Sequence, residues 1–442
     1  MKIIIPQLEL TEGDGFKHDL FDRKPFAQAL TNLIRRTNDP LVIGIDGSWG
    51  EGKTTFVKSW QDLLNDNHVP NIYIDAFASD YVDDAFMVVA GAISDYMQEN
   101  APPEKASEFI DTAKKVGAHV LSIGTKIAIR AATGGLANVD DFKSFENTIE
   151  GVGDDISNSA EKYIKSKLIS HKKEHSTINQ FKSYLSTIPQ TLSSTTDHPL
   201  TIIIDELDRC RPSFAVEMLE KIKHLFSVKN ITFVLVINKI QLEESIRSTY
   251  GGNIDAHTYL QKFLTIEAVI PKICGDNTSI ISKYCYHLAH ILEIPQNSDV
   301  PQLFEAIGEH LSLTLRQLEK SYSNFMLALA SGNFRVNQSA PLLVVFCVMK
   351  SINPSAFKSL QKKDITYTKI FNDINYSDAE VHHSSVLRYM MTWIKASLMD
   401  DSEYNSYDLH SAERKIFQGV HVSSRRDHFD FILNKVKNFS VT

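Results

Sequence analysis

The residues with the clearest chemical signature form a glycine-rich segment that ends in a lysine and a threonine. The spacing is Gly47, four residues, Gly52, Lys53 and Thr54, which is the Walker A pattern. Glycines let successive backbone N–H groups turn inward around phosphate oxygens, and the following helix directs its positive end at them. Lys53 is expected to reach the β- and γ-phosphates, and the Thr54 hydroxyl to ligate Mg²⁺. Trp49 is expected either to pack beside the phosphates or to support the loop. The expected nucleotide-binding residues are Gly47, Ser48, Trp49, Gly50, Glu51, Gly52, Lys53, Thr54 and Thr55.

A second signature is a pair of carboxylates that directly follows an apolar run. Residues 202–204 are all isoleucine, and Asp205 and Glu206 come next. Asp205 is expected to hold the Mg²⁺ shell. Glu206 is expected to polarise the attacking water, which needs a carboxylate within hydrogen-bond reach. Solvated acids at a strand end are the alternative, and the Walker A pattern upstream favours the catalytic interpretation.

Asn238 closes the next apolar run. A polar side chain there can orient the lytic water or sense the γ-phosphate, and an asparagine turn that ends a strand is an equal alternative. Asn238 and Lys239 also begin the Asn-Lys-x-Asp pattern of GTPases, in which the aspartate accepts two hydrogen bonds from guanine. Gln241 stands in the fourth position, and its amide offers a donor as well as an acceptor. The sequence therefore favours ATP over GTP.

Two arginines follow the acidic pair. Arg209 and Arg211 could stabilise transferred phosphoryl charge, in cis or in a neighbouring subunit. Salt bridges at the start of a helix are the alternative, and the sequence favours it.

The elements that must position these residues are predicted from runs of apolar residues. The predicted strands are 41–46, 71–75, 200–205, 231–237 and 263–270. The predicted helices are 54–64, 83–100, 214–226, 278–292, 300–311, 314–330 and 340–350. Strands that alternate with helices predict an α/β fold with a parallel sheet and right-handed crossovers. The chain beyond Pro271 is predicted to be wholly helical.

Four segments are predicted. Residues 1–100 form the first part of the nucleotide-binding core, 101–196 a helical insertion, 197–271 the second part of the core, and 272–442 an all-α domain. Within the insertion, 116–139 is apolar but carries His119, Lys126 and Arg130 on one helical face. An amphipathic helix packed on the protein is favoured over membrane contact.

Composition excludes several classes of protein. A formal net charge of −8 argues against a nucleic-acid coat protein, which needs a basic surface, and neither a helicase motif nor a basic stripe with interleaved aromatic residues is present. The cysteines form no CxxC pair, which excludes a zinc knuckle and a thioredoxin-like site. Buried thiols and a cytoplasmic location are expected. The cysteines are Cys210, Cys274, Cys285 and Cys347.

Three stretches resemble the KAP family of P-loop NTPases: residues 47–55, 75–86 and 203–263. The resemblance implies a three-layer core of the additional-strand type, a catalytic glutamate beside the Walker B aspartate, and a helical insertion that carries transmembrane helices in many members. The insertion of this chain is too polar to span a membrane. The family usually has aspartate at the position of Asn238. Arg316 resembles an arginine that reaches the nucleotide from a lid, and a surface arginine is the alternative.

Three functions are compatible with these patterns. The first is an ATPase that hydrolyses Mg²⁺–ATP to drive a conformational switch or assembly with a protein partner or a second copy. The resemblance adds a role in bacterial defence against phage or in plasmid exclusion. The second is an ATP-bound scaffold with little hydrolysis. The third is a small-molecule phosphotransferase, for which no acceptor-site motif is present.

Overall fold

The computed structural model divides the chain into two compact units. The sheet unit consists of Pro25–Gly47 and Val57–Ile270, and the helical unit consists of Met1–Lys24, Ser48–Phe56 and Pro271–Thr442. The described residues are 2–6, 13–82, 84–132, 176–192, 198–295, 297–331, 336–362, 364–377, 384–406 and 425–438. Within them, only the backbone is described for residues 118–132, 336–338, 401 and 405–406.

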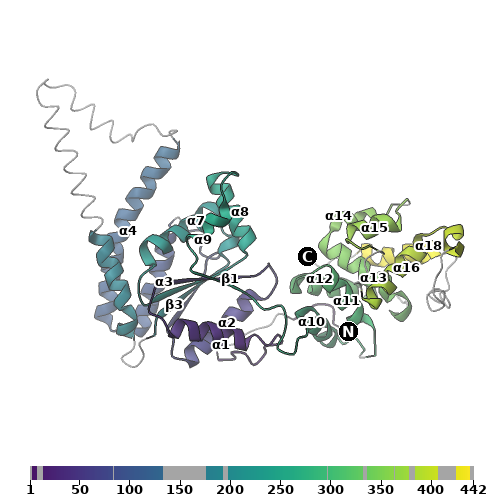
Figure 1. The fold of residues 1–442 in the computed structure, drawn as a ribbon, viewed down its shortest axis with the longest axis horizontal. Helices are drawn as coiled ribbons and strands as arrows, with labels where there is room; N and C mark the ends of the chain where they lie inside the picture. The colour runs from purple at the N-terminus through teal and green to yellow at the C-terminus, as the bar shows by residue number, and fades with distance from the viewer. Residues whose placement is uncertain are drawn as a thin grey trace, which may run out of the picture. The chain divides into compact units, whose positions relative to one another are not determined.

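The sheet unit contains a five-stranded parallel sheet (Figure 1). Its spatial order is β2 (Asn71–Asp75), β3 (Leu200–Asp205), β4 (Ile231–Ile237), β1 (Leu41–Asp46) and β5 (Ile266–Val269). Every residue of β3 and β4 is buried, which explains why these strands are continuous apolar runs. The predicted α/β fold with a parallel sheet is confirmed.

Strand β5 is shorter than the predicted strand over 263–270. The N–H groups of Phe263 and Leu264 both donate to the carbonyl of Leu260, so these residues complete the turn that ends α9 (Ala256–Gln261). The strand can begin only after this turn. Because β5 lies at the edge of the sheet, its side chains alternate between half-buried and exposed.

Helices cover both faces of the sheet (Figure 1). On one face, α1 (Lys24–Arg35) and α2 (Lys53–Asp66) are joined by the indole N–H of Trp60, which donates to Thr31 Oγ1 at 2.9 Å. The other face packs against α3 (Ala85–Asn100), α7 (Pro212–Lys221), α8 (Lys239–Tyr250) and α9 in one hydrophobic core. The predicted helix over 214–226 is divided, because α7 is followed by a π-helical turn, η2 (Ile222–Phe226).

The predicted insertion supplies two helices to this unit, α4 (Pro103–Ala132) and a helix over residues 176–192. Phe109 in α4 packs on Phe181, with ring centroids 6.1 Å apart, and Phe181 packs on Phe86 of α3 at 5.6 Å. Of the predicted amphipathic helix over 116–139, residues 133–139 and the side chains of His119, Lys126 and Arg130 lie outside the described residues. No helix among the described residues is both long and apolar enough to cross a membrane.

The helical unit beyond Pro271 contains helices and no named strand in its described part, as predicted. Helix α13 is its centre, because every residue from Leu342 to Met349 is buried. The rings of Phe304 and Tyr322 stack at 3.9 Å, and Phe346 meets Phe429 edge-on at 4.9 Å. The helices are α10 (Ile280–Ile291), α11 (Val300–His310), α12 (Leu315–Ala330), α13 (Val336–Ile352), α14 (Pro354–Ser359), α15 (Tyr367–Asp373), α16 (Ser385–Leu398), α17 (Asp401–Ser406) and α18 (Arg425–Lys437).

The cysteines are distributed over both units. Cys210, Cys274, Cys285 and Cys347 are all buried and in no disulfide. Burial raises the pKa of the Cys210 thiol to about 12. The expectation of buried thiols is confirmed.

Candidate nucleotide-binding site

The carboxyl edge of the sheet collects the polar strand ends of the sheet unit. Asp75 ends β2 and lies in register with Asp205 at the end of β3. Asp46 ends β1 opposite Ile237, the last residue of β4, and Asn238 follows. Ligand sites of open parallel sheets lie at this edge. The structure thus brings the predicted residues Asp205 and Asn238 to one edge, and adds Asp75, which the strand-end pattern of the sequence could have indicated.

Asp205 is fully buried and accepts hydrogen bonds on both carboxylate oxygens. The hydroxyl of Tyr73 donates to Oδ2 at 3.2 Å, and the N–H of Glu206 donates to Oδ1 at 2.8 Å. Burial, followed by the charge of Asp205, raises the pKa of Tyr73, so the phenol remains a donor. A buried carboxylate held in this way has a fixed orientation.

Glu206 has an unusual backbone conformation. It is in the left-handed region, at φ 60° and ψ 22°, which costs energy for a residue other than glycine and is found at functional sites. Burial raises the pKa of Glu206, Arg209 opposes this effect, and Asp205, Asp75 and Asp208 add to it. A carboxyl whose pKa is closer to neutrality is a better general base.

Both arginines beyond the acidic pair form ion pairs inside the sheet unit. Arg209 Nη1 lies 2.7 Å from Glu206 Oε1, across the short helix η1 (Leu207–Arg209). Arg211 Nε lies 2.9 Å from Asp80 Oδ1, and its backbone N–H donates to Oδ2 of the same carboxylate at 2.9 Å. These contacts match the salt-bridge alternative.

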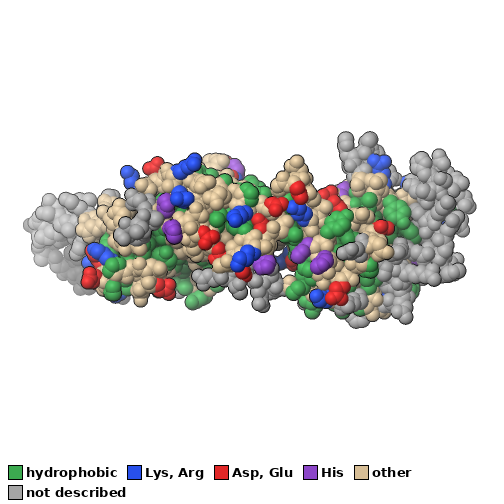
Figure 2. All heavy atoms as spheres, turned by 90° about the horizontal axis from the view of Figure 1, so that it is seen from below, with side chains coloured by type: hydrophobic (Ala, Val, Ile, Leu, Met, Phe, Trp, Pro, Cys, Tyr) green, Lys and Arg blue, Asp and Glu red, His purple; other side chains and the backbone are tan. Residues whose placement is uncertain are grey.

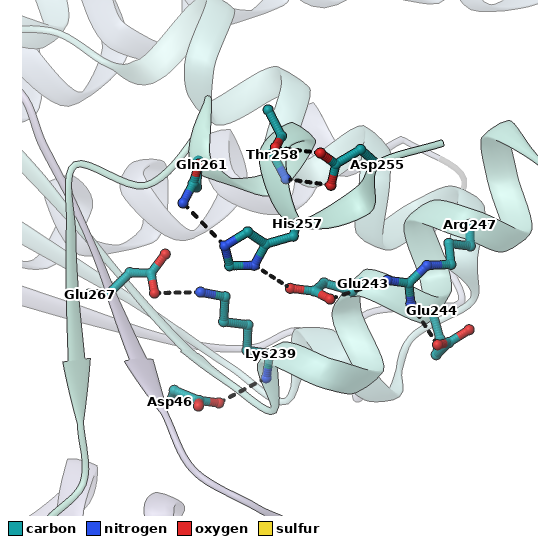
Figure 3. Close-up of polar contacts among 10 residues, drawn as sticks. All are labelled: Asp46, Lys239, Glu243, Glu244, Arg247, Asp255, His257, Thr258, Gln261 and Glu267. Atoms are coloured by element: carbon teal, nitrogen blue, oxygen red, sulfur yellow. Dashed lines mark hydrogen bonds and ion pairs between the residues drawn. The ribbon is translucent and has the colours of Figure 1, made fainter. Parts of the chain in front are cut away.

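Asn238 is the N-cap of α8, and its side-chain oxygen accepts from the N–H of Gln241 at 3.4 Å. The N–H of Lys239 donates to Asp46 Oδ1 at 2.9 Å, and Lys239 Nζ lies 2.5 Å from Glu267 Oε2 of β5 (Figure 3). Asn238 therefore has the structural role that the strand-end alternative predicted, and its sensor role stays a prediction. The contacts of Lys239 are likewise explained by the packing of α8 on the sheet.

The glycine-rich loop leaves the sheet unit through Gly47, whose N–H donates to the carbonyl of Ile237 at 3.1 Å. Its continuation, Ser48–Phe56, belongs to the helical unit. Gly50 and Gly52 have φ values of 82° and 76°, a conformation that side chains disfavour. Lys53 opens α2, is buried, and donates from Nζ to the carbonyl of Ser48 at 3.3 Å.

The remaining loop side chains differ in exposure. Trp49 is 43% exposed, so much of its side chain faces solvent. Thr54 is half-buried and Thr55 is exposed. Glu51 is buried; its Oε2 accepts from the N–H of Ser48 at 3.0 Å, and its Oε1 lies 2.7 Å from Lys272 Nζ. The carboxylate of Glu51 therefore links two residues of the same loop.

Two charged residues at this loop were missed by sequence reasoning. Arg23 Nη1 donates to the carbonyl of Glu51 at 3.0 Å, and Lys272 pairs with the side chain of the same residue. Arg23 lies 28 residues before Glu51, and Lys272 lies in another stretch of the chain. No local pattern links residues at such separations, so only the fold brings them together.

Arg316, for which the sequence suggested a lid role, contacts the loop through its backbone, and the role of its side chain stays a prediction. Its backbone N–H donates to the carbonyl of Gly50 at 3.3 Å. Thr314 caps α12 immediately before it, in a capping box with Gln317. A Cβ atom on Gly50 would lie only 2.7 Å from the Cβ of Arg316. The start of α12 thus rests directly on the loop.

Replacing Gly50 with alanine is expected to weaken nucleotide binding by about 5- to 30-fold or more, because a residue with a side chain loses about 1–2 kcal/mol on adopting the left-handed conformation, before any clash is counted. Affinity for a fluorescent ATP analogue measures the effect. Gly91→Ala is the matched control, because Gly91 lies inside α3 with no atom within 4 Å of an added Cβ. Unchanged affinity of the Gly50 variant would show that the loop does not need this conformation.

Comparisons with known proteins place these features in a family. Residues 23–330 match the KAP family P-loop domain. No curated protein matches the chain. Solved structures match over most of their length but distantly. The ORC2 protein of Aeropyrum pernix, solved as ADPNP and ADP complexes, has 12% identity and a TM-score of 0.34, with 98% of this chain and 96% of that chain covered.

Two further structures are similar at the same level. A Walker-type ATPase of Pyrococcus abyssi has 12% identity and a TM-score of 0.32, covering 85% of this chain and 91% of that chain. The replication initiator DnaA bound to AMPPCP and single-stranded DNA has 11% identity and a TM-score of 0.26, covering 86% and 88%. Similarity this distant assigns no function. The family match extends over more than half of the chain, from Arg23 beside the loop to the end of α12, and the chain therefore belongs to the KAP family of P-loop domains.

Proposed function

We propose that the chain is a Mg²⁺-dependent ATPase that binds ATP at Gly47–Thr55 and uses Glu206 as the general base. The observation that carries the proposal is the state of Glu206. Glu206 directly follows Asp205, which is fully buried at the C-terminal edge of the sheet. The backbone of Glu206 is in the left-handed conformation, and burial raises the pKa of its side chain. These are the properties of a carboxyl prepared to accept a proton.

Each residue then has a defined task. Glu206 accepts a proton from water as the water oxygen attacks the γ-phosphorus, the bond from that phosphorus to the β–γ bridging oxygen breaks, and ADP leaves. Lys53 binds the β- and γ-phosphate oxygens. The backbone N–H groups of the loop bind the phosphates from one side. Asn238 is proposed to orient the water only if its contact with Gln241 opens.

The residues proposed to hold Mg²⁺ are Asp205 and Thr54. A carboxylate and a hydroxyl are the hard oxygen donors that this ion prefers, and the buried carboxylate of Asp205 is already fixed by two donors. When bound, Mg²⁺ would neutralise charge on the phosphate oxygens.

We propose that hydrolysis drives a conformational change or assembly with a protein partner or a second copy. The start of α12 and Lys272 both contact the loop within the helical unit. A change in the conformation of the loop would therefore alter these two contacts. On the face shown in Figure 2, blue basic and red acidic side chains are interspersed among the described residues, without a broad basic area. The described residues of this face therefore offer no basic surface of the kind that nucleic acid binds. Defence against phage or plasmids is the biological setting that the family suggests.

The expected result for the purified chain is release of phosphate from ATP that depends on Mg²⁺ and stops with EDTA. GTP should be a poorer substrate, because Gln241 replaces the aspartate that selects guanine. The measurement is steady-state phosphate release across a range of protein concentrations. Specific activity that rises with concentration would indicate an active site completed between copies. Tight ATP binding without phosphate release at any concentration would instead support an ATP-bound scaffold.

A further inference from the structure

Arg23 is a buried charge beside the glycine-rich loop. Its side chain is among the least exposed of the charged residues, at 3% for the whole residue. The guanidinium lies over the ring of Phe21, with Cζ 4.9 Å from the ring centroid. Burial of such a group is costly unless it finds acceptors. The acceptors that Arg23 finds are main-chain carbonyls.

The guanidinium joins the loop to the chain that follows the sheet. Nη1 donates to the carbonyl of Glu51 at 3.0 Å and to that of Gly52 at 3.5 Å. Nη2 donates to the carbonyl of Pro271 at 3.5 Å. All of these residues belong to the helical unit. The contact at 3.0 Å is the strong one, and the other two are at the limit of a hydrogen bond.

The geometry of the peptide group gives these contacts a consequence for the loop. In a planar trans peptide, the carbonyl of one residue and the N–H of the next point in opposite directions. Arg23 holds the carbonyl of Glu51, and the carbonyl of Gly52 accepts from the N–H of Phe56 at 3.0 Å as well as from Arg23 at 3.5 Å. The N–H groups of Gly52 and Lys53 are therefore turned away from the guanidinium. Those two N–H groups belong to the part of a Walker A loop that binds phosphate oxygens.

We propose that Arg23 is a positioning residue that fixes the peptide group between Glu51 and Gly52 and, together with the first turn of α2, the one between Gly52 and Lys53, so that the N–H groups of Gly52 and Lys53 are directed at phosphate before the nucleotide arrives. The proposal rests on the proposed binding of ATP at this loop. Arg23 does not touch the phosphates in this role. It acts by reducing the number of conformations that the loop must give up on binding.

The type of residue and its surroundings fit this task. A guanidinium presents several donors in a rigid fork and stays charged, whereas an ammonium is a point charge on a flexible stem. Burial lowers the pKa of Arg23, and the charges of Asp19 and Glu51 oppose that effect. The guanidinium also lies close to the loop backbone, because a Cβ added to Gly52 would be only 3.3 Å from Arg23 Nη1.

The test compares the affinities of Arg23→Gln and of the unchanged protein for ATP and ADP. Losing a hydrogen bond from a charged donor should weaken both nucleotides by a similar factor, about 10- to 100-fold. Arg23→Lys should recover part of the loss. Lys24→Gln is the matched control, because Lys24 is next to Arg23 in sequence but its side chain is exposed. This variant should bind both nucleotides like the unchanged protein.

The outcomes separate the two proposals. If the unchanged protein binds neither ATP nor ADP, the proposed function fails. If it binds them, and a folded Arg23→Gln variant with an unchanged circular dichroism spectrum binds them equally well, only the role of Arg23 is overturned. Should Arg23→Gln fail to fold, Arg23→Lys decides by the same comparison. A loss of affinity for ATP alone, with the affinity for ADP unchanged, would also overturn the role, because the N–H groups of Gly52 and Lys53 are proposed to bind phosphates that both nucleotides carry.

Discussion

Replacing Glu206 with glutamine is expected to leave ATP bound and to slow its hydrolysis by about 10²- to 10⁴-fold, the usual contribution of a general base. The amide keeps the size of the side chain but cannot accept the proton of the attacking water. The left-handed backbone of this residue is held by its own contacts: its N–H donates to Asp205 Oδ1 at 2.8 Å, and its carbonyl accepts from the N–H of Arg209 at 3.0 Å. The exchange should therefore leave the fold intact. Single-turnover phosphate release and retention of labelled ATP on a filter measure the two effects.

The control for this variant is Glu217→Gln on α7. Burial also raises the pKa of Glu217, which pairs with Lys221, so both exchanges remove a carboxyl with a perturbed pKa. Only Glu206→Gln should change the rate. Hydrolysis by Glu206→Gln at the unmodified rate would mean that Glu206 is not the base.

The pH profile gives a second readout of the same residue. A base works only in its ionised form, so the rate should fall as the pH decreases through its pKa. Because burial raises the pKa of Glu206, this fall should occur at a higher pH than for an exposed glutamate. The fall should be missing from the residual activity of Glu206→Gln.

The core of the fold was predictable because a parallel sheet that is covered on both faces requires strands that are continuous runs of apolar residues. The runs that became β3 and β4 are apolar from end to end, since every residue is covered. The prediction was wrong where that condition fails. Strand β5 lies at the edge and alternates in exposure, and the apolar residues Phe263 and Leu264 before it belong to a turn. An apolar run alone cannot distinguish these cases.

The candidate site was predictable only where its chemistry is local. The loop residues Gly47–Thr54 are consecutive in sequence, and Asp205 and Glu206 are adjacent. The structure places Asp205 at the end of β3, at the expected edge of the sheet, and Glu206 directly after it. The contacts of Arg23 and Lys272 with Glu51 join distant stretches, so no periodicity could show them. The capping bond of Asn238 is local, yet the same residue type serves a cap and a catalytic role equally well.

Replacing Lys53 with alanine is expected to weaken ATP binding by about 10²- to 10⁴-fold, because contacts of a charged donor to two phosphate groups are lost at about 1.5–3 kcal/mol each. The side chain is buried at the start of α2 and directed along the loop, with Nζ 3.3 Å from the carbonyl of Ser48. Titration with a fluorescent ATP analogue measures the loss. Lys58→Ala, at an exposed position of α2, should bind ATP like the unchanged protein.

The comparison of ATP with ADP distinguishes Lys53 from Arg23 at the same loop. Lys53 is proposed to contact the β- and γ-phosphates, so Lys53→Ala should weaken ATP more than ADP. Arg23 is proposed to act only through the N–H groups of Gly52 and Lys53, so Arg23→Gln should weaken both equally. A Lys53→Ala variant that weakens ATP and ADP by the same factor would show that the ammonium does not reach the γ-phosphate. One that binds ATP at full strength would contradict the assignment of this loop as the nucleotide site, because the ammonium of Lys53 is proposed to bind both terminal phosphates.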